Sequence, residues 1–141
     1  IYLLLENNMQ DFSEINDFLS KEEIKKYIDD FLVSHQSLND ESIIDAFDQL
    51  CELADRQCNT YTILEKEYQD KITRFIKKYI KFNDIEVMDA VLYIIPNLGL
   101  KDAFQFILKN RYKIKKREII RLLDKCIKEY GETVENPYSD L

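Results

Sequence analysis

Residues 31–47 read FLVSHQSLNDESIIDAF, and residues 75–91, 44 positions later, read FIKKYIKFNDIEVMDAV. The two stretches share aromatic, polar and apolar positions. Asn39-Asp40 aligns with Asn83-Asp84, and Asp45-Ala46 aligns with Asp89-Ala90. A single helix pair cannot bury its own apolar stripe, so a two-helix unit repeated at this period predicts stacked pairs that share one core.

Helical spacing extends outward from the repeat in both directions. Ser20 and Glu23 form a capping box, and the following apolar residues recur at positions i, i+3, i+4, i+7 and i+8 from Ile24. Further helices are expected near residues 40–55, from the Thr62–Glu65 start to Ile80, from the Asn83 cap to a stop at Pro96, on to Lys109, and over 115–130. No segment alternates with a period of two. The fold class is therefore all-α, with a single domain at 1–131 and a frayed tail at 132–141.

Residues 39–50 and 83–94 carry a resemblance to HEAT-like α-solenoid repeats, which extends over about residues 20–109. The resemblance implies a short stack of antiparallel helix pairs. The chain departs from that family because it lacks the usual basic residue early in the second helix of each unit. A compact helical bundle is the alternative.

The composition limits the kind of protein. The chain has 141 residues, of which 45% are hydrophobic, with two glycines, two prolines and three cysteines. An odd cysteine count without C-x-x-C spacing indicates neither disulfides nor zinc, and we expect no cofactor, no metal and a cytoplasmic location. The apolar opening Ile1–Leu5 ends at Glu6, too short for a membrane span, and its role is left open, as is the oligomeric state.

Charge is unevenly distributed along the chain. Residues 1–59 hold 14 acidic and 4 basic residues, whereas residues 101–128 hold 10 basic and 3 acidic residues, within a net charge of −7. The two opposite regions are two candidate contact surfaces.

The acidic stripe lies within the helix expected at residues 40–55 and is spaced 4, 3, 4 and 3 residues apart. Its members are Glu41, Asp45, Asp48, Glu52 and Asp55. Like charges at these spacings cost about 0.2–0.5 kcal/mol per pair, or about 1–2 kcal/mol for the stripe, and no lysine in that helix relieves them. The missing positive charge comes either from this chain's Lys71, Arg74, Lys78 and Lys81 or from a basic partner. Asp89, Tyr61 and Tyr93 are added as candidate partner contacts.

The basic segment is the alternative binding surface, for nucleic acid. It comprises Lys109, Arg111, Lys113, Lys115, Lys116 and Arg117, with Tyr112 among them. The segment can also be interpreted as purely structural, as a basic inter-helix turn that faces the acidic half of the molecule. The net charge opposes direct binding of nucleic acid, which is therefore not the expected partner.

Catalytic patterns are weak. His35 is the only histidine, and it lies in an expected connection between helices without a neighbouring nucleophile. Adjacent carboxylates on a helix point apart and do not make an acid–base pair. We expect no enzymatic activity.

Small, acidic, helical proteins of this type are similar to some immunity proteins of bacterial polymorphic or contact-dependent toxins. That resemblance implies a module that neutralises a cognate toxin domain, most simply a nuclease, by covering its basic surface. The rivals are a nucleic-acid or ribonucleoprotein accessory factor that uses residues 109–121, and a helical adaptor that grips a partner helix in an apolar groove.

Overall fold

The computed structural model describes residues 16–131 and 133–134, and the described residues form α-helices and no strand. The prediction of an all-α fold is confirmed. The helices are α2 (Lys21–Ser34), α3 (Asp40–Cys58), α4 (Lys66–Tyr79), α5 (Ile85–Leu98), α6 (Lys101–Lys109) and α7 (Arg117–Tyr130), with a short 3₁₀ turn η2 (Arg111–Lys113) between the last two. None of these helices is both long enough and apolar enough to cross a bilayer.

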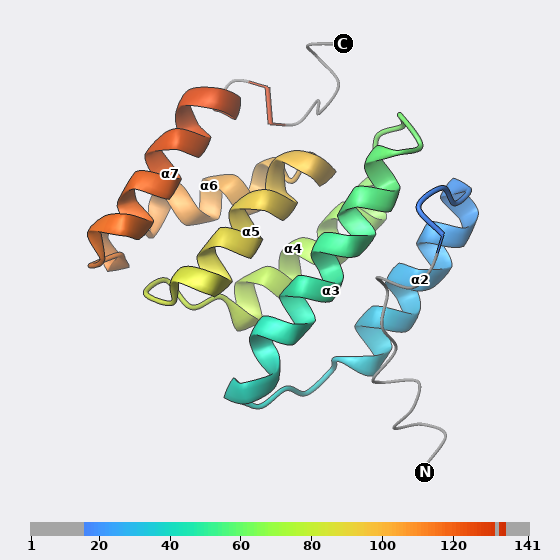
Figure 1. Ribbon diagram of the computed structural model, residues 1–141, viewed down its shortest axis with the longest axis horizontal. Coiled ribbons are helices and arrows are strands. Elements are labelled where there is room, and N and C mark those ends of the chain that lie inside the picture. Colours follow the sequence, from blue (N-terminus) through green and yellow to red (C-terminus); the bar gives the residue numbers. More distant parts are fainter. Residues whose placement is uncertain (1–15, 132, 135–141) are drawn as a thin grey trace.

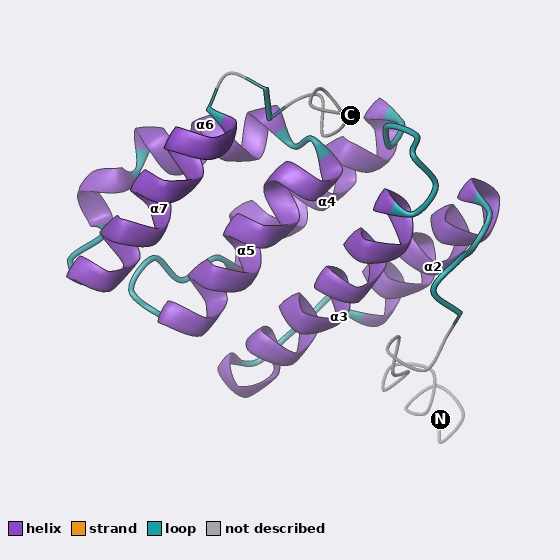
Figure 2. Ribbon diagram, turned by 45° about the horizontal axis from the view of Figure 1, so that its top comes forward, coloured by secondary structure: helices purple, strands orange, loops and turns teal. Residues whose placement is uncertain are grey.

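The helices form two layers (Figures 1 and 2). One layer holds α3, α5 and α7, which run in the same direction, and the other holds α2, α4 and α6, which run the opposite way. Cross-helix bonds between α3 and α5 keep a nearly constant offset: Cys51 Sγ donates to the Ala90 carbonyl, Asp55 accepts from Tyr93, and Cys58 Sγ donates to the Asn97 carbonyl. The second helices of the two repeat units, α3 and α5, therefore lie side by side within one layer.

The core between the layers is built from the apolar faces that the helical spacing indicated. Phe31 and Phe75, which the repeat aligns, meet edge to face with ring centroids 5.2 Å apart. Phe47 from α3 packs on Phe75 at 5.5 Å in the same manner. Burying a side chain of this size stabilises the fold by about 1.5–3 kcal/mol, so these rings tie α2, α3 and α4 together.

Two helix starts differ from the expectation. The side chain of Asp84, rather than Asn83, caps α5 by accepting from the Glu86 and Val87 amides, and α4 begins at Lys66 without a side-chain cap. Asn83 is used elsewhere, because its amide bridges the backbone of Lys113 and Lys115 across the stack.

The end of α5 also differs, because the helix continues through Pro96 to Leu98 and stops at Gly99. Proline at this position removes the amide that would bond the Leu92 carbonyl, and its ring crowds the same carbonyl. The Cys126 thiol approaches that carbonyl at 4.0 Å. The chain then turns at Gly99, whose φ of 67° is the left-handed conformation that glycine tolerates best.

Both chain ends lie largely outside the described residues. Within the expected tail 132–141 the structure describes only Thr133 and Val134, and the Val134 side chain is buried. The apolar opening Ile1–Leu5 falls outside the described residues.

Candidate partner-binding face

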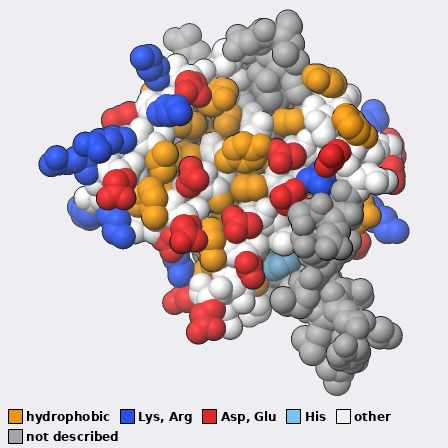
Figure 3. Space-filling model, in the orientation of Figure 1, with side chains coloured by type: hydrophobic (Ala, Val, Ile, Leu, Met, Phe, Trp, Pro, Cys, Tyr) orange, Lys and Arg blue, Asp and Glu red, His pale blue; other side chains and the backbone are white. Residues whose placement is uncertain are grey.

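The outer face of the α3–α5–α7 layer carries the acidic stripe. Figure 3 shows acidic side chains spread across this face with apolar side chains between them. All five stripe residues belong to α3, and Asp89 and Tyr93 lie on the adjacent α5, one helical turn apart. The face therefore extends over two helices, not one.

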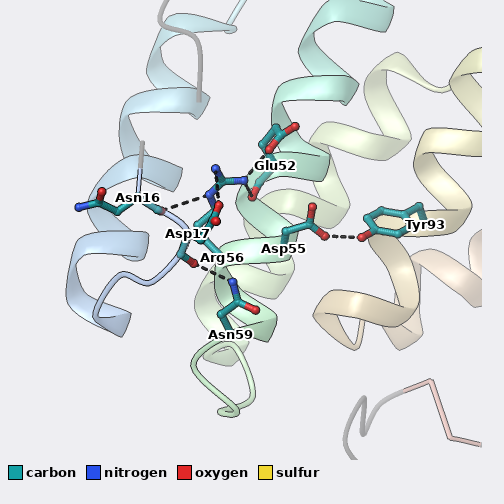
Figure 4. Close-up of polar contacts among 7 residues, drawn as sticks. All are labelled: Asn16, Asp17, Glu52, Asp55, Arg56, Asn59 and Tyr93. Atoms are coloured by element: carbon teal, nitrogen blue, oxygen red, sulfur yellow. Dashed lines mark hydrogen bonds and ion pairs between the residues drawn. The ribbon is translucent and has the colours of Figure 1, made fainter. Parts of the chain in front are cut away.

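Glu52, in the C-terminal part of the stripe, is paired within its own helix (Figure 4). Arg56, one turn after Glu52, pairs with the Glu52 carboxylate at 2.5 Å and with Asp17 at 3.3 Å. Its guanidinium also donates to the Asn16 and Glu52 carbonyls, and the side chain is only 4% exposed. The expectation that the stripe has no compensation inside its helix is wrong at Glu52, because an arginine at i+4 supplies it.

Asp55 is also engaged, because its carboxylate accepts a hydrogen bond from the Tyr93 hydroxyl (Figure 4). This bond, followed by burial, raises the pKa of Tyr93 above the ordinary tyrosine value. The bond fixes the Tyr93 ring over the junction of α3 and α5 while 46% of the side chain stays exposed. Tyr93 is therefore an oriented, accessible aromatic group.

The basic residues on α4 and after it do not reach the stripe. Lys71 pairs with Asp29 at 3.4 Å and with Glu67 at 3.5 Å, both in the opposite layer. Lys78 donates to the Gln36 carbonyl, and Lys81 pairs with Asp40, which precedes the stripe. Arg74 is exposed on the same helix and has no ion pair with the stripe. The prediction that these four basic residues compensate the acidic stripe is therefore not supported by the contacts in the structure.

Four carboxylates on this face have no ion pair with any described residue. They are Asp45, Asp48, Glu86 and Asp89, all of them exposed. Partial burial, then Asp45, Glu86 and Glu52 in that order, raise the pKa of Asp48. Glu41, which likewise has no ion pair among the described residues, lies in the first turn of α3, where the helix dipole stabilises it. The centre of the face is thus a local excess of negative charge.

A shallow groove of about 290 Å³ runs between α3 and α5 beside three of these carboxylates. Its apolar lining comes from Ile44, Cys51 and Ala90, and its polar lining from Asp48, Glu86, Asp89 and Tyr93. Burial raises the pKa of the Cys51 thiol to about 12, so this thiol stays protonated and unreactive. The groove combines an apolar floor with an acidic rim.

A second groove of about 280 Å³ separates α5 from α7. Leu92, Pro96, Leu122 and Cys126 contribute apolar surface, with Lys125 and Glu129 of opposite charge at its edge. Asp89 and Tyr93 line both grooves and therefore form the ridge between them.

Tyr61 lies apart from this ridge. It follows the end of α3 in the connection to α4, with a positive φ of 54° and a side chain that is 71% exposed. Neither groove is lined by it. Of the candidate contacts, the structure groups Asp45, Asp48, Asp89 and Tyr93, and it leaves Tyr61 outside the group.

The basic segment occupies the opposite edge of the layer, around the end of α6, η2 and the start of α7. All six of its basic residues are exposed, and Arg111 pairs with Asp124 at 3.0 Å. No described ion pair joins the segment to the acidic first half. The segment does form the turn between α6 and α7, but no described contact joins that turn to the acidic half of the molecule.

His35, the only histidine, ends α2. Its ring stacks on Phe31 with centroids 4.3 Å apart, and its Nδ1 lies 2.7 Å from the Phe31 carbonyl. Within the described part of the chain, no three His, Cys, Asp or Glu side chains are grouped so as to hold a metal ion. His35 therefore takes part in the packing at a helix end.

Two features of this face were not predicted from the sequence: Glu86 lines the groove, and Arg56 is buried and pairs with Glu52. Arg56 was detectable, because its position four residues after Glu52 is the helical spacing of an ion pair. Glu86 was not, because only the packing of α5 against α3 brings it to Asp48.

No family model matches this chain, and neither a curated protein nor a solved structure is significantly similar to it.

Proposed function

We propose that this chain is a cytoplasmic, non-enzymatic immunity protein, which neutralises a toxin domain by covering its basic surface with the α3–α5 groove. The partner surface would present lysine or arginine side chains around an apolar contact. A nuclease domain fits this description best, because its active-site cleft must be cationic to bind phosphates.

The observation that carries the proposal is the set of unpaired carboxylates, Asp48, Glu86 and Asp89, along the α3–α5 groove, with the charge of Asp45 beside Asp48. Charges of one sign gathered on adjacent helices cost stability in the free protein. A cationic partner would remove that cost and would be steered to the face by its field. Tyr93, held in place by Asp55, supplies the kind of aromatic anchor common in binding hot spots.

The helical-adaptor alternative is less well supported. An adaptor that grips a partner helix through apolar contacts needs an apolar groove. Both grooves on this face have carboxylates on their edges, and the α3–α5 groove has three. The face favours a basic partner over an apolar one.

The test takes as the partner a toxin domain encoded by a reading frame next to this chain's gene. We expect co-expression of the chain to rescue growth of cells that produce this domain. The double variant Asp45→Lys/Asp48→Lys should lose protection, and its association rate constant should fall by about tenfold or more at low ionic strength. Stopped-flow fluorescence at low and high salt measures the rate.

The matched control is Glu22→Lys/Asp30→Lys, which makes the same change in net charge at exposed positions on α2, in the opposite layer. It should protect as well as the wild type. If the α3 variant folds and protects fully, or if no neighbouring toxin domain is bound, the proposal is wrong.

A further inference from the structure

We propose that the basic corner at the α6–α7 connection binds single-stranded nucleic acid. We define this corner as residues 109–121. The proposal does not depend on the toxin-neutralising face, because the two surfaces use different residues and opposite charge.

The corner carries a concentrated positive charge. Residues 109–121 contain seven basic residues and one acidic residue, Glu118. All seven bases are exposed, and Asp124 is the one described carboxylate paired with any of them, through Arg111. Exposed, unpaired cations in this number are the usual means of binding a phosphate backbone.

The structure holds these cations on a defined loop. The Asn83 side chain accepts from the Lys115 amide at 2.7 Å and donates to the Lys113 carbonyl at 2.9 Å. The Lys115 ammonium donates to the Tyr112 carbonyl at 3.0 Å. The loop is therefore fixed to the start of α5, and the cost of ordering it on binding is reduced.

Tyr112 distinguishes nucleic acid from other polyanions. Its side chain is 67% exposed within the basic corner, and the Lys113 ammonium lies 6.0 Å from its ring centroid. An exposed aromatic face beside cations can stack an unpaired base while the cations hold the adjacent phosphates. A base inside a duplex does not offer its face, so the single strand is the better ligand.

An anionic membrane surface would be the other partner for such a charge. Stable membrane binding by a basic segment needs several apolar side chains that insert between lipids. Tyr112 is the one large hydrophobic side chain that is exposed within the corner. The single aromatic suits stacking and does not suit insertion.

The net charge of −7 does not prevent this contact. Exposed charges more than about 8 Å apart are largely screened at physiological ionic strength. In Figure 3 the basic side chains gather at the edge of the molecule near α7, whereas the acidic ones spread over its centre. A strand bound at the corner experiences mainly the local positive field.

The experiment measures fluorescence anisotropy of a labelled oligouridylate with the full chain over a range of salt concentrations. We expect a dissociation constant of about 10⁻⁶ to 10⁻⁴ M at moderate salt and a clear loss of affinity as salt rises. Lys115→Glu/Lys116→Glu should abolish binding. Tyr112→Ala should weaken binding about fivefold or more and leave the salt slope unchanged, because it removes stacking but no cation.

Lys21→Glu/Lys26→Glu is the matched control, with the same charge change at exposed positions on α2. It should bind like the wild type, and circular dichroism confirms that each variant is folded. The proposal is overturned if the wild type does not bind the oligonucleotide, or if the α2 variant loses as much affinity as the corner variant. Tighter binding to anionic phosphatidylserine vesicles than to the oligonucleotide would also overturn it.

Discussion

Arg56 is a charged residue in a buried position, and its partners explain how the position is tolerated. Its guanidinium pairs with two carboxylates, from Glu52 and Asp17, and donates hydrogen bonds to two backbone carbonyls. The Asn59 side chain holds the Asp17 carbonyl at 2.7 Å (Figure 4). Arg56 therefore joins α3 to the chain segment that precedes α2.

Replacement of Arg56 by methionine should lower the free energy of unfolding by about 1–3 kcal/mol. The reason is the loss of several charge-assisted hydrogen bonds at a buried site. Arg56→Lys should cost less than Arg56→Met, because it keeps the charge and loses the planar fork. Urea unfolding followed by circular dichroism measures both, and equal stability of Arg56→Met and wild type would contradict the assignment.

The hydrogen bonds of two tyrosines predict weakening of the fold at alkaline pH. The Tyr68 hydroxyl donates to Asp29 at 2.9 Å, which raises the pKa of Tyr68 to about 12 in the folded protein. The unfolded chain releases this proton near pH 10. The contribution to stability is therefore complete below about pH 10 and is lost as the pH rises toward about 12.

Tyr68→Phe should accordingly be less stable than the wild type at neutral pH and should lose less stability between about pH 10 and 12. Tyr93→Phe should likewise lower stability at neutral pH and reduce its loss at alkaline pH, because the Asp55 bond raises the pKa of Tyr93 as well. Urea midpoints across this range test the effect. Tyr112→Phe removes an exposed hydroxyl and should leave the free energy of unfolding at neutral pH unchanged.

At the scale of the helices, several ends could be predicted because capping is a local interaction. The Ser20 capping box forms as expected, with the Glu23 amide donating to Ser20 Oγ at 3.1 Å and the Ser20 amide donating to Glu23 Oε1 at 3.0 Å. Asn39 likewise caps α3 through the Ser42 amide. Asn83 did not cap α5, because the loop before α7 occupies its side chain.

Gly99 ends α5, and substitutions at this position test whether its left-handed backbone conformation contributes to stability. Gly99→Ala should lower the free energy of unfolding by about 1–2 kcal/mol, because a side chain opposes the left-handed conformation at φ 67°. Gly99→Asn should cost less, because asparagine tolerates this conformation better. Thermal or urea unfolding of the two variants decides the matter, and a larger loss for asparagine would argue against a backbone origin.

Over the whole molecule, the two-layer stack concentrates charge that is spread along the sequence. The parallel arrangement of α3 and α5 places Glu86 and Asp89 across the groove from Asp48. Acidic residues on one helix thereby meet acidic residues on its neighbour, and Lys66 and Lys71 of α4 pair with carboxylates of the other layer.

Asp48→Asn should therefore stabilise the free protein at neutral pH by about 0.4–1 kcal/mol. The substitution removes repulsion with Asp45 at i−3 and Glu52 at i+4, and Glu86 adds to the effect. Asp30→Asn, at an exposed position on α2 one turn after Lys26, should be neutral or slightly destabilising. Urea unfolding compares the two, and a destabilised Asp48→Asn would mean that a cation of this chain already pairs with Asp48.

The all-α class, the buried faces of most helices, most helix starts and the acidic stripe on α3 could all be predicted from the amino-acid sequence. These properties depend on interactions between residues a few positions apart, and the helical periodicity of the sequence indicates which residues interact. Which carboxylates remain unpaired depends on helix packing, since Tyr93 reaches Asp55 and Glu86 lies near Asp48 from a helix far along the chain. The distances between side chains on different helices are set by how the buried side chains pack together. The spacing of charges along a single helix does not predict these distances.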